Sequence, residues 1–162
     1  MRHNWFASEE DFSKWLQARL KEQRFHVQSF DEVGDGVPDL NAGGGGIEAW
    51  MELKLSRRIT SVHELIQLDH PLLISQYWWL KERQRLGNAK CAVVVAWRTN
   101  AGQYVSFIPI EHWKERIGQT LMTWGLCAYT TTIGRLGDGA DRVSDLLSAR
   151  RWRRPAQRGV RT

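Results

Sequence analysis

The stretch from Val37 to Leu55 reads VPDLNAGGGGIEAWMELKL, and it decides the fold that we expect. The four glycines Gly43 to Gly46 separate two strand-like segments, which predicts a hairpin with a flexible turn. The first strand is expected over Val37 to Leu40, with its proline at the entry, where no ladder donor is needed. The second covers Ile47 to Leu55, and its alternation puts different side chains on its two faces. One face carries Glu48, Trp50, Glu52 and Lys54, and the other carries Ala49, Met51, Leu53 and Leu55.

A helix and a strand precede this hairpin. Ser8 is a good N-cap, three acidic residues follow it, and the apolar spacing predicts a helix over residues 8–23. The alternation in residues 25–33 predicts a strand, and Gly34-Asp35-Gly36 predicts a turn.

More helices and strands follow the hairpin. A capping-box pattern at 61–64 predicts a short helical turn, and Pro71 and Gly87 mark the ends of a helix over 71–86. The later elements are expected as strands over 90–97, 103–109 and 128–133, with short helices near 110–117 and 140–150. The sequence therefore predicts an α/β fold with a small mixed central sheet flanked by helices.

The hairpin would bring two carboxylates together, because antiparallel strands joined by the glycine turn place Asp39 beside Glu52. The two side chains would then be close enough to share a divalent cation. Mg²⁺ prefers hard oxygen ligands, and the backbone carbonyl of Leu53 would add a third. Lys54 emerges on the same face as Glu52, where its ammonium can orient or help to deprotonate a water, or hold a phosphate. These groups suit phosphodiester hydrolysis, in which metal ions activate the nucleophile and neutralise developing charge.

Pro38-Asp39 with Glu52-Leu53-Lys54 resembles the motif of the PD-(D/E)XK nuclease superfamily. This group includes restriction endonucleases, archaeal Holliday-junction resolvases, RecB-type nuclease domains and the VRR-NUC group. The resemblance covers about residues 8–98 and is strongest to small phage or resolvase-type members. It implies a restriction-endonuclease-like core, Mg²⁺ or Mn²⁺ bound by Asp39 and Glu52, and a catalytic role for Lys54.

The resemblance also implies site residues outside the motif. Many members carry a metal-binding glutamate on the first helix, for which Glu9 and Glu10 are both candidates. Several branches have a glutamine at the start of the helix after the third strand, and Gln76 fits that place. Many members act as dimers, so a homodimer is an expectation from the resemblance alone.

The net charge of +5 is concentrated at the end of the chain. Residues 149–162 contain six arginines and no acid, which leaves 17 basic and 18 acidic groups in residues 1–148. We expect one nuclease-like domain over 1–148 and a basic tail over 149–162 that helps to hold DNA. The residues expected to contact nucleic acid are Arg57, Arg58, Arg150, Arg151, Arg153 and Arg154.

Several classes of protein are not favoured. Cys91 and Cys127 stand far apart, which argues against a zinc site or a disulfide framework. Gly43 to Gly46 lack the Lys-Ser/Thr of a P-loop, so no nucleotide cofactor is expected. No apolar run approaches the roughly 20 residues of a membrane span, and the charged N-terminal residues predict an intracellular protein, of phage or mobile-element origin if the resemblance holds.

The sequence thus predicts a metal-dependent deoxyribonuclease. A single small domain leaves little chain for a separate specificity domain, so branched or single-stranded DNA is the expected substrate. Two alternatives stay open: a non-catalytic nucleic-acid-binding or assembly protein with the same fold, and an RNA-directed nuclease.

Overall fold

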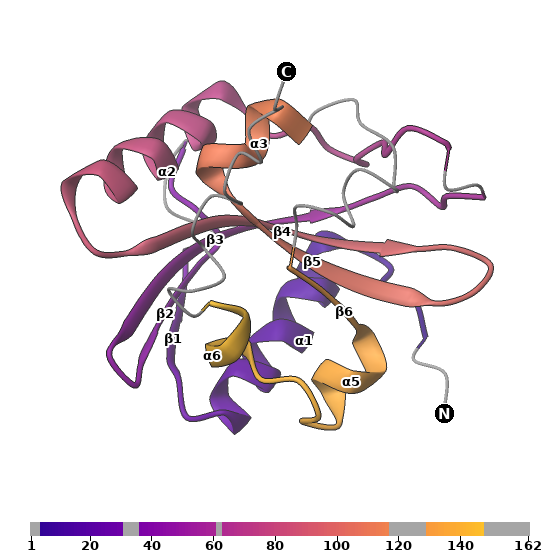
Figure 1. Ribbon diagram of the computed structural model, residues 1–162, viewed down its shortest axis with the longest axis horizontal. Helices are drawn as coiled ribbons and strands as arrows, with labels where there is room; N and C mark the ends of the chain where they lie inside the picture. The colour runs from indigo at the N-terminus through magenta and orange to yellow at the C-terminus, as the bar shows by residue number, and fades with distance from the viewer. Residues whose placement is uncertain (1–3, 31–35, 61–62, 117–128, 148–162) are drawn as a thin grey trace, which may run out of the picture.

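A six-stranded sheet forms the middle layer of the molecule, and helices lie on both of its faces (Figure 1). The computed structural model describes residues 4–30, 36–60, 63–116 and 129–147. The strands are β1 (His26–Ser29), β2 (Leu40–Gly44), β3 (Ile47–Leu55), β4 (Lys90–Arg98), β5 (Gln103–Pro109) and β6 (Tyr129–Thr132). The helices are α1 (Glu9–Glu22), α2 (Ile74–Leu86), α3 (Ile110–Arg116), α5 (Ile133–Gly137) and α6 (Val143–Leu146).

The strands lie side by side in chain order, from β1 to β6. β3 and β4 run parallel, with α2 as the crossover between them, and every other neighbouring pair is antiparallel. The sheet is therefore mixed, and the predicted α/β class is confirmed.

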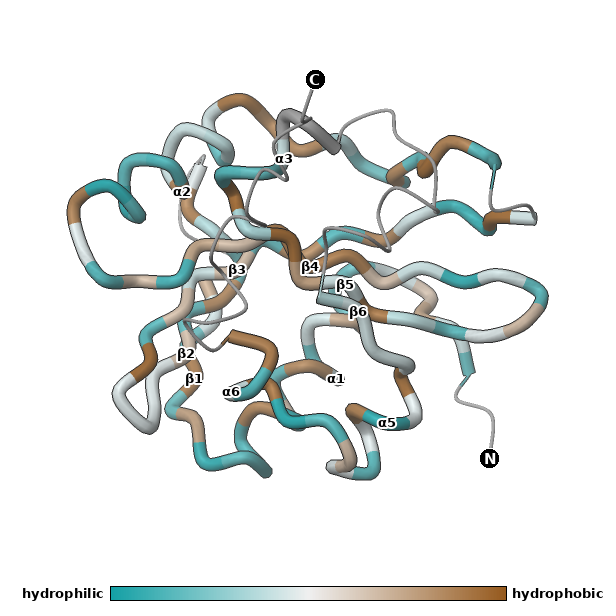
Figure 2. Tube along the Cα trace, viewed as in Figure 1, coloured by the Kyte–Doolittle hydropathy of each residue, from teal (hydrophilic) through white to brown (hydrophobic). Residues whose placement is uncertain are grey.

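Each face of the sheet packs against its own set of helices. One hydrophobic cluster joins α1, α5 and α6 to the sheet, and it includes Phe12, Leu16 and Met51. The other joins α2 and α3 to the opposite face, and it includes Leu80 and Trp113. In Figure 2 the most hydrophobic part of the chain runs through the centre of the sheet, around β4.

The hairpin of β2 and β3 forms at the glycine run, as predicted, with a shorter turn. Gly45 and Gly46 both have positive φ, +58° and +79°, which a two-residue hairpin turn requires and glycine tolerates at no steric cost. Gly43 and Gly44 belong to β2 itself and pair with β3. The register is therefore fixed by a two-residue turn, and it sets which residue of β3 lies across from each residue of β2.

Two expected boundaries are wrong. The strand expected over residues 37–40 begins only at Leu40, so Pro38 and Asp39 precede β2. The helix expected from Pro71 begins at Ile74, because Leu73 has extended backbone and donates its N–H to the side chain of Gln76. Gly87 follows α2 with extended backbone, without the left-handed conformation of a typical C′ glycine.

The segment between β3 and α2 also differs from the prediction. The structure shows no helix in residues 63–73, although a helical turn was expected over 61–64, of which 61–62 lie outside the described residues. Leu68 instead forms a β-bridge with Ser56, and Asp69 donates its N–H to the Leu55 carbonyl at 2.8 Å. These bonds return the chain to the end of β3.

The C-terminal part contains one helix that the pattern did not predict. The expected strand over 128–133 stops at Thr132, whose side chain accepts the N–H of Arg135 and caps α5. The helix expected near 140–150 is the single turn of α6 within the described residues. None of the described helices is both long and apolar enough to cross a membrane.

Candidate active site

Asp39 lies directly before β2, at the place where its carboxylate reaches β3. Leu40 pairs with Met51, so Asp39 falls across from Glu52 in the same register. Its Oδ2 accepts the backbone N–H of Leu53 at 2.8 Å, and its own carbonyl accepts the N–H of Phe30 at 3.0 Å. The predicted juxtaposition of Asp39 with the Glu52-Leu53-Lys54 segment is therefore present in the structure.

The Leu53 carbonyl, the third expected ligand, faces the same way. In a strand, the N–H and the C=O of one residue point to the same side. Because the N–H of Leu53 points to Asp39, its carbonyl also points to that edge of β3.

Glu52 is buried on the face of β3 that α2 covers, with 1% of its surface exposed. Its Oε1 accepts hydrogen bonds from Gln76 Nε2 at 2.6 Å and from Lys54 Nζ at 3.2 Å. Its Oε2 is equally buried and has no hydrogen-bond partner among the described residues. A buried carboxylate oxygen without a partner is costly, so this position calls for a ligand.

Lys54 and Gln76 hold Glu52 from two sides. Lys54 is 4% exposed, and its ammonium forms an ion pair with Glu52 across one residue of the strand. Gln76 lies in the first turn of α2, where its Oε1 accepts the N–H of Leu73 at 2.9 Å while its Nε2 donates to Glu52. The glutamine amide is thus oriented at both ends, and it ties the start of α2 to β3.

The structure distinguishes between the two glutamates of α1. Glu9 Oε1 is buried with no hydrogen-bond partner among the described residues, and its pKa responds to Lys54, His70 and Asp39. Glu10 points away, with 70% of its side chain exposed and an ion pair to Lys14 at 3.1 Å. Glu9, and not Glu10, therefore lies at the cluster that Asp39, Glu52 and Lys54 form.

The negative charge of the cluster favours either protonation of its carboxylates or binding of a cation. Burial and the neighbouring Asp39 charge raise the pKa of Glu52 to about 7, although Lys54 acts in the opposite direction. Burial also raises the pKa of Glu9, against the opposing effects of Lys54 and His70. One lysine thus offsets only part of the negative charge of three carboxylates, and strongly shifted groups of this kind are common at functional sites.

His70 is a member of this environment that the sequence did not reveal. It follows Asp69, whose N–H is bound to the Leu55 carbonyl, and this bond brings it near Glu9. The five histidines have no metal-type spacing, so only the path of the chain after β3 could have identified it.

The two arginines after β3 lie beyond the cluster. Both are exposed, and Arg58 donates to Asn100 Oδ1 at 2.7 Å while Arg57 reaches Gln67 Oε1 at 3.5 Å. The other expected nucleic-acid contacts, Arg150, Arg151, Arg153 and Arg154, lie outside the described residues.

Comparison with known proteins supports the fold and leaves the activity open. No protein-family model and no curated protein sequence matches the chain. Among solved structures, the chain is similar to that of Hjc, a Holliday junction resolvase from Archaeoglobus fulgidus, a hyperthermophilic archaeon. The TM-score is 0.51 at 15% sequence identity, and the match covers 86% of this chain and 99% of that one. The fold is restriction-endonuclease-like.

The donor set fits a divalent cation of the magnesium type. Within the described ranges, no three side chains of His, Cys, Asp and Glu form a complete metal site on their own. Mg²⁺ does not require one, because it keeps several waters and is commonly held by one or two carboxylates. Asp39 and Glu52 would supply the carboxylates, and Glu52 Oε2 has no hydrogen-bond partner among the described residues.

Proposed function

We propose that this protein is a divalent-metal-dependent nuclease that hydrolyses DNA phosphodiester bonds, with its active site at Asp39, Glu52 and Lys54. The observation that carries the proposal is the Glu52 carboxylate, which is buried beside a second acid and a lysine while one of its oxygens has no partner among the described residues. The resemblance of the sequence motif and the similarity of the fold to a Holliday junction resolvase support the same conclusion.

Mg²⁺ or Mn²⁺ would be held by Asp39, Glu52 and the Leu53 carbonyl, with Glu9 as a further acid nearby. The ion supplies Lewis-acid chemistry, which acidifies a bound water and neutralises charge on the phosphate. The Leu53 N–H fixes Asp39 in place, and Gln76 fixes Glu52, so both carboxylates are oriented before any ligand arrives. This preorganisation limits the cost of ordering them when substrate binds.

Lys54 is proposed to act on the substrate directly. Its ammonium shares the face of β3 with Glu52, so it can contact the scissile phosphate or orient the attacking water. Gln76 acts through Glu52, and we regard it as a positioning residue.

The test is metal-dependent cleavage of a panel of substrates: linear duplex, four-way junction, flap and single-stranded DNA, with matched RNA. We expect cleavage of branched or single-stranded DNA with Mg²⁺ or Mn²⁺ and none with EDTA. Asp39→Ala and Lys54→Ala should both abolish it. Equal activity in wild type and both variants would refute the proposal, and binding without cleavage would favour the non-catalytic alternative. Preferential cleavage of RNA would favour the alternative of an RNA-directed nuclease.

We further propose that residues 149–162 act as a basic tail that strengthens DNA binding, although they lie outside the described residues. Deletion of 150–162 should weaken binding and reduce its salt dependence while leaving metal-dependent cleavage at saturating DNA. An unchanged salt slope would exclude this role.

We also propose that two copies associate. Apolar side chains are exposed at the start of α2, where Ile74 is 75% and Leu73 is 52% exposed, and burial of such surface favours association. Light scattering should give twice the 18.8 kDa mass of one chain, and Ile74→Asp should reduce it to that mass. A monomeric wild type would contradict the proposal.

A further inference from the structure

A second polar site lies away from the catalytic cluster, in a cavity of about 570 Å³ beside the hairpin of β4 and β5. Four segments surround it: α1, the residues after β3, the β4–β5 hairpin, and the junction of β6 with α5. Its lining includes three arginines, Arg19, Arg58 and Arg98, and no acidic residue. Arg19 forms an ion pair with Glu22 just outside the lining, so the cavity keeps a net positive charge from Arg58 and Arg98, which favours a bound anion.

Two of the three guanidinium groups keep a buried donor that has no partner among the described residues. Arg19 pairs with Glu22 at 2.8 Å through Nη2, yet its Nε is buried without a partner among the described residues. Arg98 lies over the ring of Trp5 at 4.8 Å, and its Nε is likewise buried and unpaired in the described part of the chain. Buried donors of this kind cost free energy unless a ligand satisfies them.

Aromatic rings form two walls of the same cavity. Trp15 lies on α1, with the Arg19 guanidinium 5.7 Å from its ring centroid. Tyr104 stacks on Trp97 at 4.3 Å between centroids, which holds its ring in place on β5. Arginines beside aromatic rings are the combination that binds phosphate and stacks on a base.

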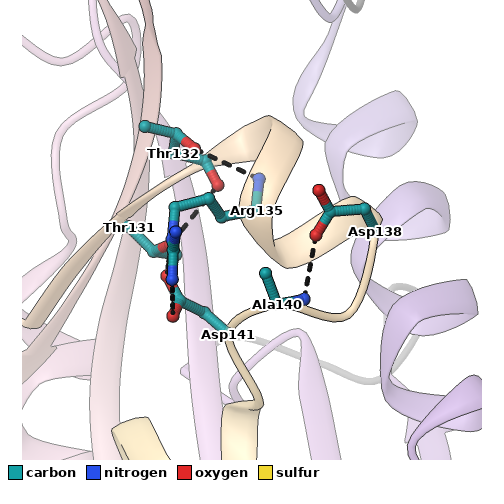
Figure 3. Close-up of polar contacts among 6 residues, drawn as sticks. All are labelled: Thr131, Thr132, Arg135, Asp138, Ala140 and Asp141. Atoms are coloured by element: carbon teal, nitrogen blue, oxygen red, sulfur yellow. Dashed lines mark hydrogen bonds and ion pairs between the residues drawn. The ribbon is translucent and has the colours of Figure 1, made fainter.

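The α5 wall of the cavity is held rigidly by its own contacts. Arg135 makes two hydrogen bonds to Asp141, at 2.9 and 3.0 Å, and Asp141 also accepts the hydroxyl of Thr131 (Figure 3). Arg135 does not line the cavity, so it is not one of the anion-binding groups. The neighbouring Gly134 has open space where a side chain would begin, which leaves room for a ligand.

We propose that this arginine pocket, formed by Arg19, Arg58 and Arg98, binds a phosphate-bearing nucleotide unit. Arginine forks match phosphate oxygens, and the cavity falls within the usual size range of sites for small ligands. The nucleotide can belong to a nucleic-acid strand or be free, since both present the same phosphate and base.

If the nucleotide belongs to a nucleic-acid strand, the proposal rests on the proposed nuclease function. Arg19 and Glu9 lie ten residues apart on α1, about 15 Å along the helix axis. That is about four base steps of a DNA strand. The pocket is therefore separate from the cluster, yet a strand bound at the cluster can extend to it.

The experiment measures binding with EDTA present, so that the result does not depend on cleavage. Fluorescence anisotropy of a labelled single-stranded oligonucleotide gives the affinity and its salt slope, and calorimetry with dTMP and with inorganic phosphate gives binding of the small anions. Arg58→Ala is the first variant, because this residue is exposed. Arg98→Lys is the second variant. It keeps the positive charge but removes the planar guanidinium that can donate two hydrogen bonds to one phosphate, and it disturbs the fold less than a truncation would.

A control variant separates the loss of a pocket charge from the loss of any surface charge. Arg85→Ala removes an exposed arginine of α2 that pairs with Glu82 and does not line the pocket. It should bind the oligonucleotide within about twofold of wild type.

We expect Arg58→Ala to weaken oligonucleotide binding about tenfold, because it loses a charge-assisted bond. The salt slope should fall by about one. A loss confined to dTMP and phosphate would identify a free nucleotide as the ligand. If neither variant changes the affinity for any of these probes, the arginine pocket is not a phosphate site. Weaker binding by these variants in a protein that never cleaves would refute the nuclease and leave the pocket standing.

Discussion

Glu48 and Glu52 lie four residues apart on the same face of β3, but their surroundings are opposite. The Glu48 side chain is 45% exposed, and its Oε1 accepts hydrogen bonds from Arg83 at 3.0 Å and from the Trp50 ring at 2.9 Å. These bonds lower its pKa. Glu52 is buried, keeps one oxygen without a partner among the described residues, and has its pKa raised to about 7.

The contrast shows how a structural carboxylate differs from one held for chemistry. A protein that needed only an ion pair could use the Glu48 arrangement, in which the carboxylate stays partly in water and costs little to hold. Burial of Glu52 beside Asp39 is unfavourable unless a cation or a substrate offsets the cost of burying the two carboxylates together. The following predictions test this difference, beginning with the largest expected effect.

Cleavage should depend on Glu52 and not on Glu48. We expect Glu52→Gln to reduce the cleavage rate by about 10³-fold or more, because the charge that holds the metal is lost while the shape is kept. Glu48→Gln should stay within about twofold of wild type. Both rates are measured on the preferred DNA substrate at saturating Mg²⁺. A similar loss in the two variants would remove the distinction between the two glutamates.

The two glutamates of α1 give a second, smaller contrast. Glu9→Gln should weaken the apparent affinity for Mn²⁺ by about 10–100-fold, as expected for a group that supports the metal site from nearby. Glu10→Gln should have no effect, because Glu10 is exposed and forms an ion pair with Lys14. The measurement is the Mn²⁺ concentration for half-maximal cleavage. If only Glu10→Gln raised the Mn²⁺ concentration for half-maximal cleavage, α1 would have to be oriented differently from the structure.

Stability without metal should depend on pH in a way that identifies Glu52. The folded protein binds the Glu52 proton more tightly than the unfolded chain does, so the free energy of unfolding should decrease as pH rises from about 4.5 to about 7. The decrease should be on the order of 3 kcal/mol. Glu52→Gln should lose most of this dependence.

Glu48→Gln should keep that dependence. The contribution of Glu48 itself to the free energy of unfolding has the opposite pH dependence, because its pKa is lowered in the folded protein. This contribution is present above the ordinary carboxyl pKa and is lost as pH falls below it. It should be under about 0.5 kcal/mol, because the ion pair with Arg83 is exposed. Urea unfolding of the three proteins in EDTA, at several pH values, provides the data. A wild type whose stability rises between pH 5 and 7 would contradict the raised pKa.

The core of the candidate site could be predicted because it is local in sequence. A two-residue glycine turn fixes the register of β2 and β3, and that register alone brings Asp39 to Leu53. The alternation of β3 then decides that Glu52 and Lys54 share one face. Gln76 was predicted from the resemblance, and its bond to Glu52 depends on a helix that begins three residues later than expected.

The rest of the surroundings depends on contacts between distant segments. Glu9 and Glu10 are equivalent in sequence, and only the packing of α1 on the sheet separates them. His70 comes near Glu9 because the chain after β3 returns to that strand at Leu68 and Asp69. The arginine pocket combines four segments with no common motif, and its two buried guanidinium nitrogens are visible only in three dimensions.

The most direct test of the central claim is a crystal structure of the protein soaked in Mn²⁺, with anomalous scattering used to locate the ion. We predict a manganese peak between Asp39, Glu52 and the Leu53 carbonyl, and no peak in a crystal of Glu52→Gln treated in the same way. A fully occupied manganese site elsewhere, or no peak at the cluster at millimolar Mn²⁺, would contradict the account.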